Sequence, residues 1–130
     1  MGVSTDGLLF WGIEFCDTEE EARPWAAGAR SFWLRNKLEV TEEEDYFGEK
    51  TLAKLGFEIG EHCSYDFPIY YLAEIQTHLR ANRGYSKRVP PLEYPDSDWW
   101  REKTEMLRIV CDRLDIRFKE PSWMLASLWG

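Results

Sequence analysis

Apolar side chains occupy both alternations of residues 7–16, GLLFWGIEFC. A strand with one face in water is apolar on one alternation only, whereas a strand covered on both faces is apolar on both. The pattern therefore predicts a central, doubly covered β-strand near the start of the chain.

After Thr18, the spacing of apolar residues changes to that of a helix. Thr18 can cap a helix, and the acidic residues 19–21 suit the positive end of its dipole. Because Pro24 is tolerated only in a first turn, we expect the main helix to begin near Arg23. Its predicted buried stripe consists of Trp25, Ala29, Phe32 and Trp33.

An acidic connection follows over residues 39–54, with a short helix expected from Glu49 to Leu55 and closed by Gly56. Alternating patterns then run over residues 57–65 and 69–79. The turn signal Asp-Phe-Pro separates these two runs, so they predict an antiparallel hairpin.

The clearest helix covers residues 96–114, where PDSD supplies capping residues and apolar side chains recur at helical spacing. The last segment, residues 122–130, is apolar on both alternations and predicts a strand buried between layers. The order strand, helix, strand, strand, helix, strand predicts an α+β fold in one domain, residues 1–130. We expect a compact two-layer sandwich in which two main helices cover a small mixed or antiparallel sheet of about four strands.

Cysteine usage and apolar run length restrict the class of protein. The three cysteines form no CxxC pair or regular framework, so neither a disulfide scaffold nor a structural zinc site is indicated. The N-terminus shows no signal peptide pattern, and the apolar runs are too short to span a membrane. We therefore expect a cytoplasmic protein.

The net charge of −8 resides almost entirely in residues 1–66, in two acidic runs. Such runs are either ordinary solvated surface or a surface that imitates nucleic-acid phosphates and docks on a basic partner. The residues assigned to a partner-binding surface are Glu19, Glu20, Glu21, Glu42, Glu43, Glu44 and Asp45.

Residues 75–92 contain four cations and no acidic residue. Their guanidinium and ammonium groups could hold a phosphate or nucleotide, or could form salt bridges with the acidic surface of the protein itself. The candidate anion-binding residues are Arg80, Arg83, Tyr85, Lys87 and Arg88.

Reactive side chains are densest at His62, Cys63 and Asp66. Adjacent residues of a strand point to opposite faces, so His62 and Cys63 do not form a catalytic pair without a bulge. His62 and His78 could approach each other across the hairpin and hold a metal ion. A carboxylate from Glu58, Glu74 or Glu14 could complete the site, but the spacing of these residues in the sequence does not require a metal site. We predict no catalytic residue, no metal ligand and no cofactor.

The seven tryptophans exceed what so short a chain needs for its core. Trp100 follows Trp99 on a helix and must point about 100° away from it. Some aromatic surface is therefore expected to be exposed, which favours a face for protein interaction.

Four blocks of the sequence, GLLFWGIEF, EHCSYDFPIYYLA, RGYSKRV and SWMLASLWG, resemble a family of small bacteriophage-encoded proteins. That family shares a glycine-led first strand, an HCSYDYP-like turn and a C-terminal Trp-Gly, and no activity is assigned to it. The acidic residues 39–49 and the FWLRNKL segment lie outside the shared pattern. The resemblance implies an accessory protein made in a bacterial host cell, and it carries over no functional residue.

Three functions follow as hypotheses. The first is a non-enzymatic inhibitor of a host defence nuclease or another nucleic-acid-handling protein, acting through the acidic surface without binding DNA directly or contacting a membrane. The second is a protein that sequesters an anionic, nucleotide-like ligand with the basic residues of segment 75–92. The third is a metal-dependent hydrolase. A homodimer is compatible with all three.

Overall fold

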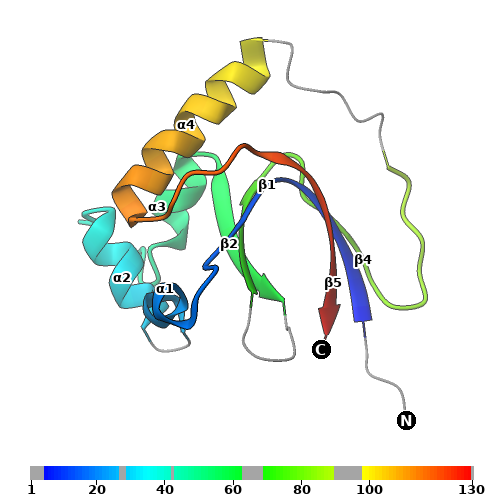
Figure 1. Ribbon diagram of the computed structural model, residues 1–130, viewed down its shortest axis with the longest axis horizontal. Helices are drawn as coiled ribbons and strands as arrows, with labels where there is room; N and C mark the ends of the chain where they lie inside the picture. The colour runs from blue at the N-terminus through cyan, green and yellow to red at the C-terminus, as the bar shows by residue number, and fades with distance from the viewer. Residues whose placement is uncertain (1–4, 27–28, 42, 63–68, 90–97, 130) are drawn as a thin grey trace.

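The computed structural model describes residues 5–26, 29–41, 43–62, 69–89 and 98–129 (Figure 1). Its elements, in chain order, are β1 (Thr5–Phe15), α1 (Glu19–Ala22), the 3-10 turn η1 (Arg23–Trp25), α2 (Arg30–Lys37), α3 (Glu49–Lys54), β2 (Phe57–His62), β3 (Ile69–Glu74), β4 (Leu79–Ala81), α4 (Asp98–Leu114) and β5 (Ser122–Trp129). The α+β class is therefore confirmed. No helix in these ranges is both long enough and apolar enough to cross a membrane.

All five strands belong to one antiparallel sheet built around β1. On one side of β1, Gly12 pairs with Ala73 of β3, and Leu9 pairs with Leu79 of β4. On the other side β5 pairs with β1 from Thr5 to Gly12. Strand β2 pairs with the outer side of β3. The sheet is thus open, with β2 and β5 at its opposite edges.

The strand predicted over residues 69–79 is divided in two. Thr77 closes a turn on Glu74, because its N–H and its hydroxyl both donate to the Glu74 carbonyl, at 3.2 and 2.8 Å. The Thr77 hydroxyl also accepts from the N–H of Trp11 at 3.0 Å, in place of a regular ladder bond. This interruption explains why the sheet has five strands rather than about four.

Both faces of β1 are buried, as its sequence predicts. Trp11 and Ile13 face the helices, and Leu8 and Phe10 face the opposite side. The sheet is arched and carries the helices on one face only (Figure 1). Beneath the arch, the ring of Phe10 stacks on that of Tyr71 at 4.8 Å. The core therefore has two parts, with β1 between them.

Helical structure begins before the expected start near Arg23, with α1, and continues as η1 and α2 rather than as one helix. Thr18 caps α1, since its hydroxyl accepts from the Glu21 N–H at 3.2 Å, as predicted. Pro24 lies in η1, and α2 begins only at Arg30. Helix α2 then turns Leu34 to the core and leaves Phe32 75% exposed, so the prediction that Phe32 is buried is wrong.

Helices α3 and α4 match their predicted positions, although the residues expected to cap α4 fall largely outside the described ranges. Trp100 is buried against Trp11 and Trp123, with ring centroids 5.0 and 5.8 Å away. The exposed aromatic surface is therefore not at Trp100. In β5, Leu125 is 80% exposed, so the prediction that this strand is buried between layers is also wrong. The helices cover the opposite end of β1 and do not reach this part of the sheet (Figure 1).

Candidate functional site

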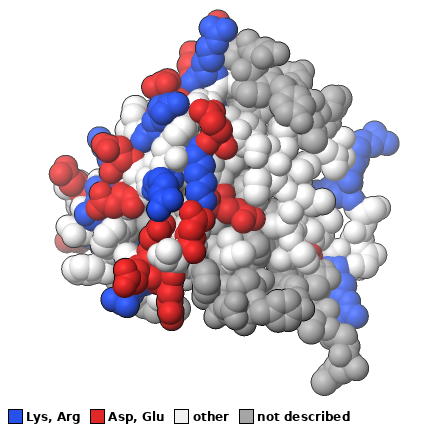
Figure 2. Space-filling model, in the orientation of Figure 1, with Lys and Arg blue, Asp and Glu red and all other residues white. Residues whose placement is uncertain are grey.

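Both acidic runs lie on the helical side of the molecule. Glu19, Glu20 and Glu21 form the first turn of α1, and Glu43 and Glu44 precede α3. Figure 2 shows acidic and basic side chains gathered over this half, whereas the charged side chains of the other half are mostly basic and lie at its outer margin. The acidic side chains visible on this face are therefore concentrated around the helices.

Basic side chains partly neutralise the first acidic run. Arg117 contacts Glu21 at 3.2 Å and Asp17 at 3.8 Å, and Lys119 donates to Asp17 at 2.8 Å. The hydrogen bond and charge of Lys119 lower the pKa of Asp17 below its ordinary value. Among the three glutamates of α1, only Glu21 makes an ion pair within the described residues, so Glu19 and Glu20 keep an uncompensated charge.

Asp45 does not belong to the acidic surface, because its side chain is only 2% exposed. Its carboxylate accepts from the N–H groups of Lys50 and Thr51, at 3.1 and 2.7 Å, and so caps the N-terminal turn of α3. Burial raises the pKa of Asp45, but these hydrogen bonds and the one from the Thr51 hydroxyl outweigh it, and the net shift is downward. Glu42, assigned to the same surface, lies outside the described residues.

Three large aromatic side chains are exposed beside the second acidic run. Phe32 on α2 is 75% exposed, and Tyr46 and Phe47 in the loop before α3 are 70% and 58% exposed. The rings of Tyr46 and Phe47 meet edge to face at 5.0 Å. An open hollow of about 450 Å³ lies between α2 and the loop. We call the following set the acidic aromatic surface: Phe32, Glu43, Glu44, Tyr46 and Phe47.

Two contacts hold the loop of this surface against α2. The guanidinium of Arg35 donates to the carbonyl of Asp45 at 2.7 Å. Gly48 has a φ of 79°, and a Cβ there would lie 2.8 Å from Cβ of Leu34. Only glycine allows this backbone angle together with this close approach. These two contacts with α2, together with the Asp45 cap on α3, fix the loop that presents Tyr46 and Phe47.

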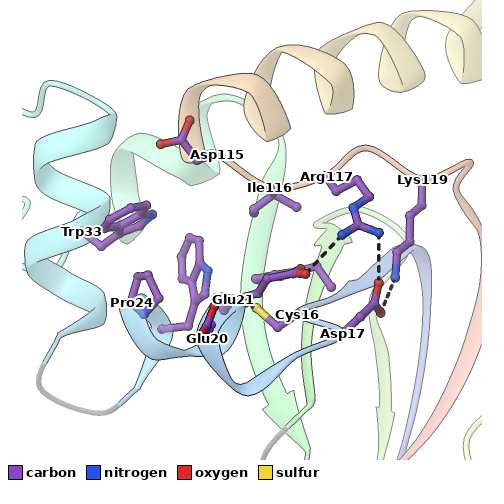
Figure 3. Close-up of a pocket in the computed structure, with 12 residues that line it drawn as sticks. Cys16, Asp17, Glu20, Glu21, Pro24, Trp33, Asp115, Ile116, Arg117 and Lys119 are labelled. Atoms are coloured by element: carbon purple, nitrogen blue, oxygen red, sulfur yellow. Dashed lines mark hydrogen bonds and ion pairs between the residues drawn. The ribbon is translucent and has the colours of Figure 1, made fainter.

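A second pocket, of about 140 Å³, opens between α1, α2 and the segment after α4 (Figure 3). Its apolar walls are Phe15, Trp25, Trp33 and Ile116, among others. In Figure 3, Arg117 and Lys119 point toward Asp17 and Glu21 at its rim, and dashed lines mark their ion pairs. The pocket therefore has a largely aromatic interior and a rim of charged side chains that form ion pairs with one another.

Cys16 lines this second pocket and has an unusual backbone angle, a φ of 72°. Its thiol donates to the carbonyl of Glu21 at 3.3 Å. Burial, and then the charges of Glu21 and Asp17, raise the pKa of Cys16 to about 12. Because the thiolate is the reactive form of cysteine, this side chain is a poor nucleophile at neutral pH.

The basic segment binds an acidic side chain of the protein itself. Arg80 donates from Nε to Asp6 at 3.1 Å and from Nη2 to the same oxygen, and the Arg83 N–H donates to the other oxygen at 2.8 Å. These bonds lower the pKa of Asp6. Tyr85, Lys87 and Arg88 are exposed further along the segment. The carboxylate of Asp6 thus takes the place that an anionic ligand would occupy at the Arg80 guanidinium and the backbone N–H of Arg83.

The two histidines lie on different parts of the hairpin. His78 places Nδ1 at 3.0 Å from Oε1 of Glu58, near the start of β2. His62 is four residues further along β2, about 13 Å away at the usual rise of a strand. No group of three or more potential metal ligands exists among the described residues. The side chains of His62, Cys63 and Asp66 lie outside the part of the chain that the structure describes.

Glu74, considered above as a metal or acid–base residue, is completely buried. Its Oε1 accepts from the Gln76 N–H at 3.0 Å and lies 3.8 Å from Nζ of Lys103. Its Oε2 has no hydrogen-bond partner among the described residues. Burial raises the pKa of Glu74, and the Gln76 N–H and the Lys103 charge offset this only in part. Glu74 holds the turn between β3 and β4 and is closed to a substrate.

The residues that sequence reasoning missed are Phe32, Tyr46 and Phe47. The excess of aromatic residues indicated an exposed aromatic face but not its position. Phe32 fits the pattern of a buried helical stripe, and Tyr46 and Phe47 lie in a segment without a periodic hydrophobic pattern. Comparison with known proteins found no matching family model, no similar curated protein and no similar solved structure.

Proposed function

We propose that this chain is a non-enzymatic binding protein whose acidic aromatic surface docks on a basic patch of a partner protein. The observation that carries the proposal is the exposure of three aromatic side chains: Phe32 and Tyr46 line one hollow, and Phe47 packs against Tyr46. Soluble proteins rarely expose a group of large apolar side chains unless another molecule covers it. Aromatic residues are also enriched in the buried centres of protein interfaces.

The charges around these aromatic residues select the kind of partner. Glu43 and Glu44 are exposed beside the hollow, while Arg35 uses its guanidinium to hold the loop. The rim is therefore predominantly negative and complements a positively charged surface. Proteins that bind nucleic acids carry such surfaces, and a carboxylate-rich rim can occupy the positions of phosphates. The setting implied by the resemblance, a phage protein in a bacterial cell, makes a host defence nuclease the leading partner class.

The two buried thiols, Cys16 and Cys111, are not activated for catalysis. Burial raises the pKa of Cys111 to about 11 and that of Cys16 to about 12, so both thiols stay protonated at neutral pH. Glu74, the carboxyl group with the most buried environment, is enclosed by the fold. These groups contribute to the core and not to a reaction centre.

Sequestration of an anionic nucleotide by the basic segment has weaker support. Arg80 and the backbone of Arg83 are engaged with Asp6 in the folded protein. A ligand would have to displace this carboxylate, with a loss of the hydrogen bonds that it accepts. Lys87 and Arg88 are exposed, but they line none of the pockets described above.

The test compares four forms of the protein as bait in a nuclease-treated bacterial lysate. They are the wild type, Phe32→Ser/Tyr46→Ser/Phe47→Ser, Glu43→Gln/Glu44→Gln and a matched control. The control, Glu102→Gln/Asp112→Asn, removes the same charge as the glutamate variant from exposed positions of α4. We expect the wild type and the control to retain a basic protein that both surface variants lose, and high salt to release it.

The captured protein is then purified and titrated against all four forms by calorimetry. The proposal predicts a loss of affinity of tenfold or more for each surface variant and little change for the control. Equal binding by all four forms would overturn it, as would the absence of any protein whose retention depends on these residues.

A further inference from the structure

Strand β5 forms an edge of the sheet that is long and open. It pairs with β1 over its full length, from Thr5 opposite Trp129 to Gly12 opposite Ser122. Among the described residues β1 is its only strand partner. No described strand pairs with the other side of β5, although β2 comes close to part of it, so unpaired backbone N–H and C=O groups lie along a strand of eight residues, roughly 26 Å at the usual rise of a strand.

This edge lacks the features that usually prevent pairing with another chain. Charged residues, prolines and covering helices protect natural edge strands. Strand β2, at the opposite edge, has such protection, since it contains Glu58 and Glu61 and has α3 beside it. Strand β4 carries Arg80. The sequence of β5, SWMLASLW, contains no charge and no proline, in a chain of which 31% is charged.

One apolar side chain of β5 is strongly exposed. Leu125, in the middle of the strand, is 80% exposed, and Ser127 is exposed as well. In Figure 2, the charged side chains of the half where β5 lies are mostly basic and lie at its outer margin, and β5 itself contains no charged residue. Two molecules of net charge −8 repel each other, so an uncharged strip is where two copies can meet at least electrostatic cost.

We propose that β5 pairs with β5 of a second copy of this chain. A two-fold axis makes the two identical strands antiparallel and joins the two sheets into one continuous sheet. The edge N–H and C=O groups of each strand then find partners, and Leu125 of each copy moves out of water. The acidic aromatic surface is formed by α2 and the loop before α3, so it stays open in the dimer and is present twice.

The experiment measures the mass of the full chain by sedimentation equilibrium over a wide range of concentrations. We expect the wild type to move from 15.4 kDa to twice that mass as concentration rises. Leu125→Lys and, separately, Ser127→Lys place like charges in the contact, and each should weaken the dimer by tenfold or more. Both positions are exposed, so circular dichroism should show an unchanged fold.

The matched control is Phe32→Lys, which makes the same kind of change at an equally exposed apolar residue away from β5. It should leave the dimer intact. Amide hydrogen exchange provides a second readout: β5 amides should be protected in the wild-type dimer and exchange at least tenfold faster in Leu125→Lys.

Three results would overturn the proposal. They are a wild type that stays at 15.4 kDa at every concentration, a dimer that Phe32→Lys disrupts and Leu125→Lys does not, and an open-ended assembly in place of a dimer. Each is distinguishable from failure of the proposed function, because partner capture depends on the acidic aromatic surface and not on β5.

Discussion

The carboxylate of Asp45 accepts two hydrogen bonds from Thr51, one from its N–H at 2.7 Å and one from its hydroxyl at 2.5 Å. Asp45 lies in the most acidic part of the sequence, yet its side chain is buried and caps the N-terminal turn of α3. The same cap positions the loop that carries Tyr46 and Phe47. The stability of this loop and the presentation of the aromatic residues are therefore coupled through one side chain.

Asp45→Ala should lower the free energy of unfolding at neutral pH by about 2 kcal/mol, because it removes a helix cap and leaves buried N–H groups without an acceptor. The pKa of Asp45 is lowered in the folded state. Its contribution is therefore fully present above the unfolded pKa of about 3.9 and is lost as pH falls through the lower folded value. Urea unfolding at pH 7 and at pH 3 measures both effects. Glu44→Ala, at the exposed neighbour, is the control and should change stability by less than about 0.5 kcal/mol.

Glu74→Gln should raise stability at neutral pH by about 1 kcal/mol, because a neutral amide replaces a buried carboxylate. Burial raises the folded pKa of Glu74, so the folded state binds this proton more tightly than the unfolded state. Wild-type stability at this site is therefore gained as pH falls through the raised pKa and lost as pH rises above it. The advantage of the variant should shrink toward zero at acidic pH.

Thermal or urea unfolding of wild type and Glu74→Gln between pH 4 and pH 8 tests this dependence. Glu102→Gln, which removes an exposed carboxylate from α4, is the control for the change of charge. A Glu74→Gln variant that is less stable at pH 7, or a difference that does not vary with pH, would contradict the assignment.

Gly60→Ala should destabilise the protein by about 2 kcal/mol. A Cβ at Gly60 would lie 2.1 Å from the hydroxyl oxygen of Tyr71, whose ring passes over β2. The cost should become small in a Tyr71→Ala background, since the clashing ring is then absent. Gly7→Ala is the matched control in the same sheet, because a Cβ there meets nothing within 4 Å. Equal costs in the two backgrounds would show that the ring of Tyr71 is not the obstacle.

The thiols of Cys16 and Cys111 should react slowly with a disulfide reagent in the folded protein. Burial raises their pKa to about 12 and about 11, so little thiolate is present near pH 8. The measurement is made on Cys63→Ser, which leaves only these two thiols. The rate should rise at least a hundredfold in denaturant, and rapid reaction of either thiol in the native state would refute the protonation that we assign.

The sequence by itself determined the elements whose hydrophobic period is strong. Strand β1, helix α4, the short helix α3 and strand β5 lie where their patterns place them. It also determined the α+β class and the cap at Thr18, because side-chain period, capping and glycine termination act over a few neighbouring residues. The expectation of an exposed aromatic face came from composition, without its location.

Only the tertiary structure decided the features that depend on residues far apart in the chain. The strand over residues 69–79 breaks because Thr77 bonds to Trp11, and Arg80 loses its freedom to bind a ligand because Asp6 approaches it. Leu125 is exposed because α4 packs on β5 at Trp123 and not at Leu125, and Phe32 because α2 starts late. Each outcome depends on which surfaces meet after folding, and the local hydrophobic pattern carries no information about those contacts.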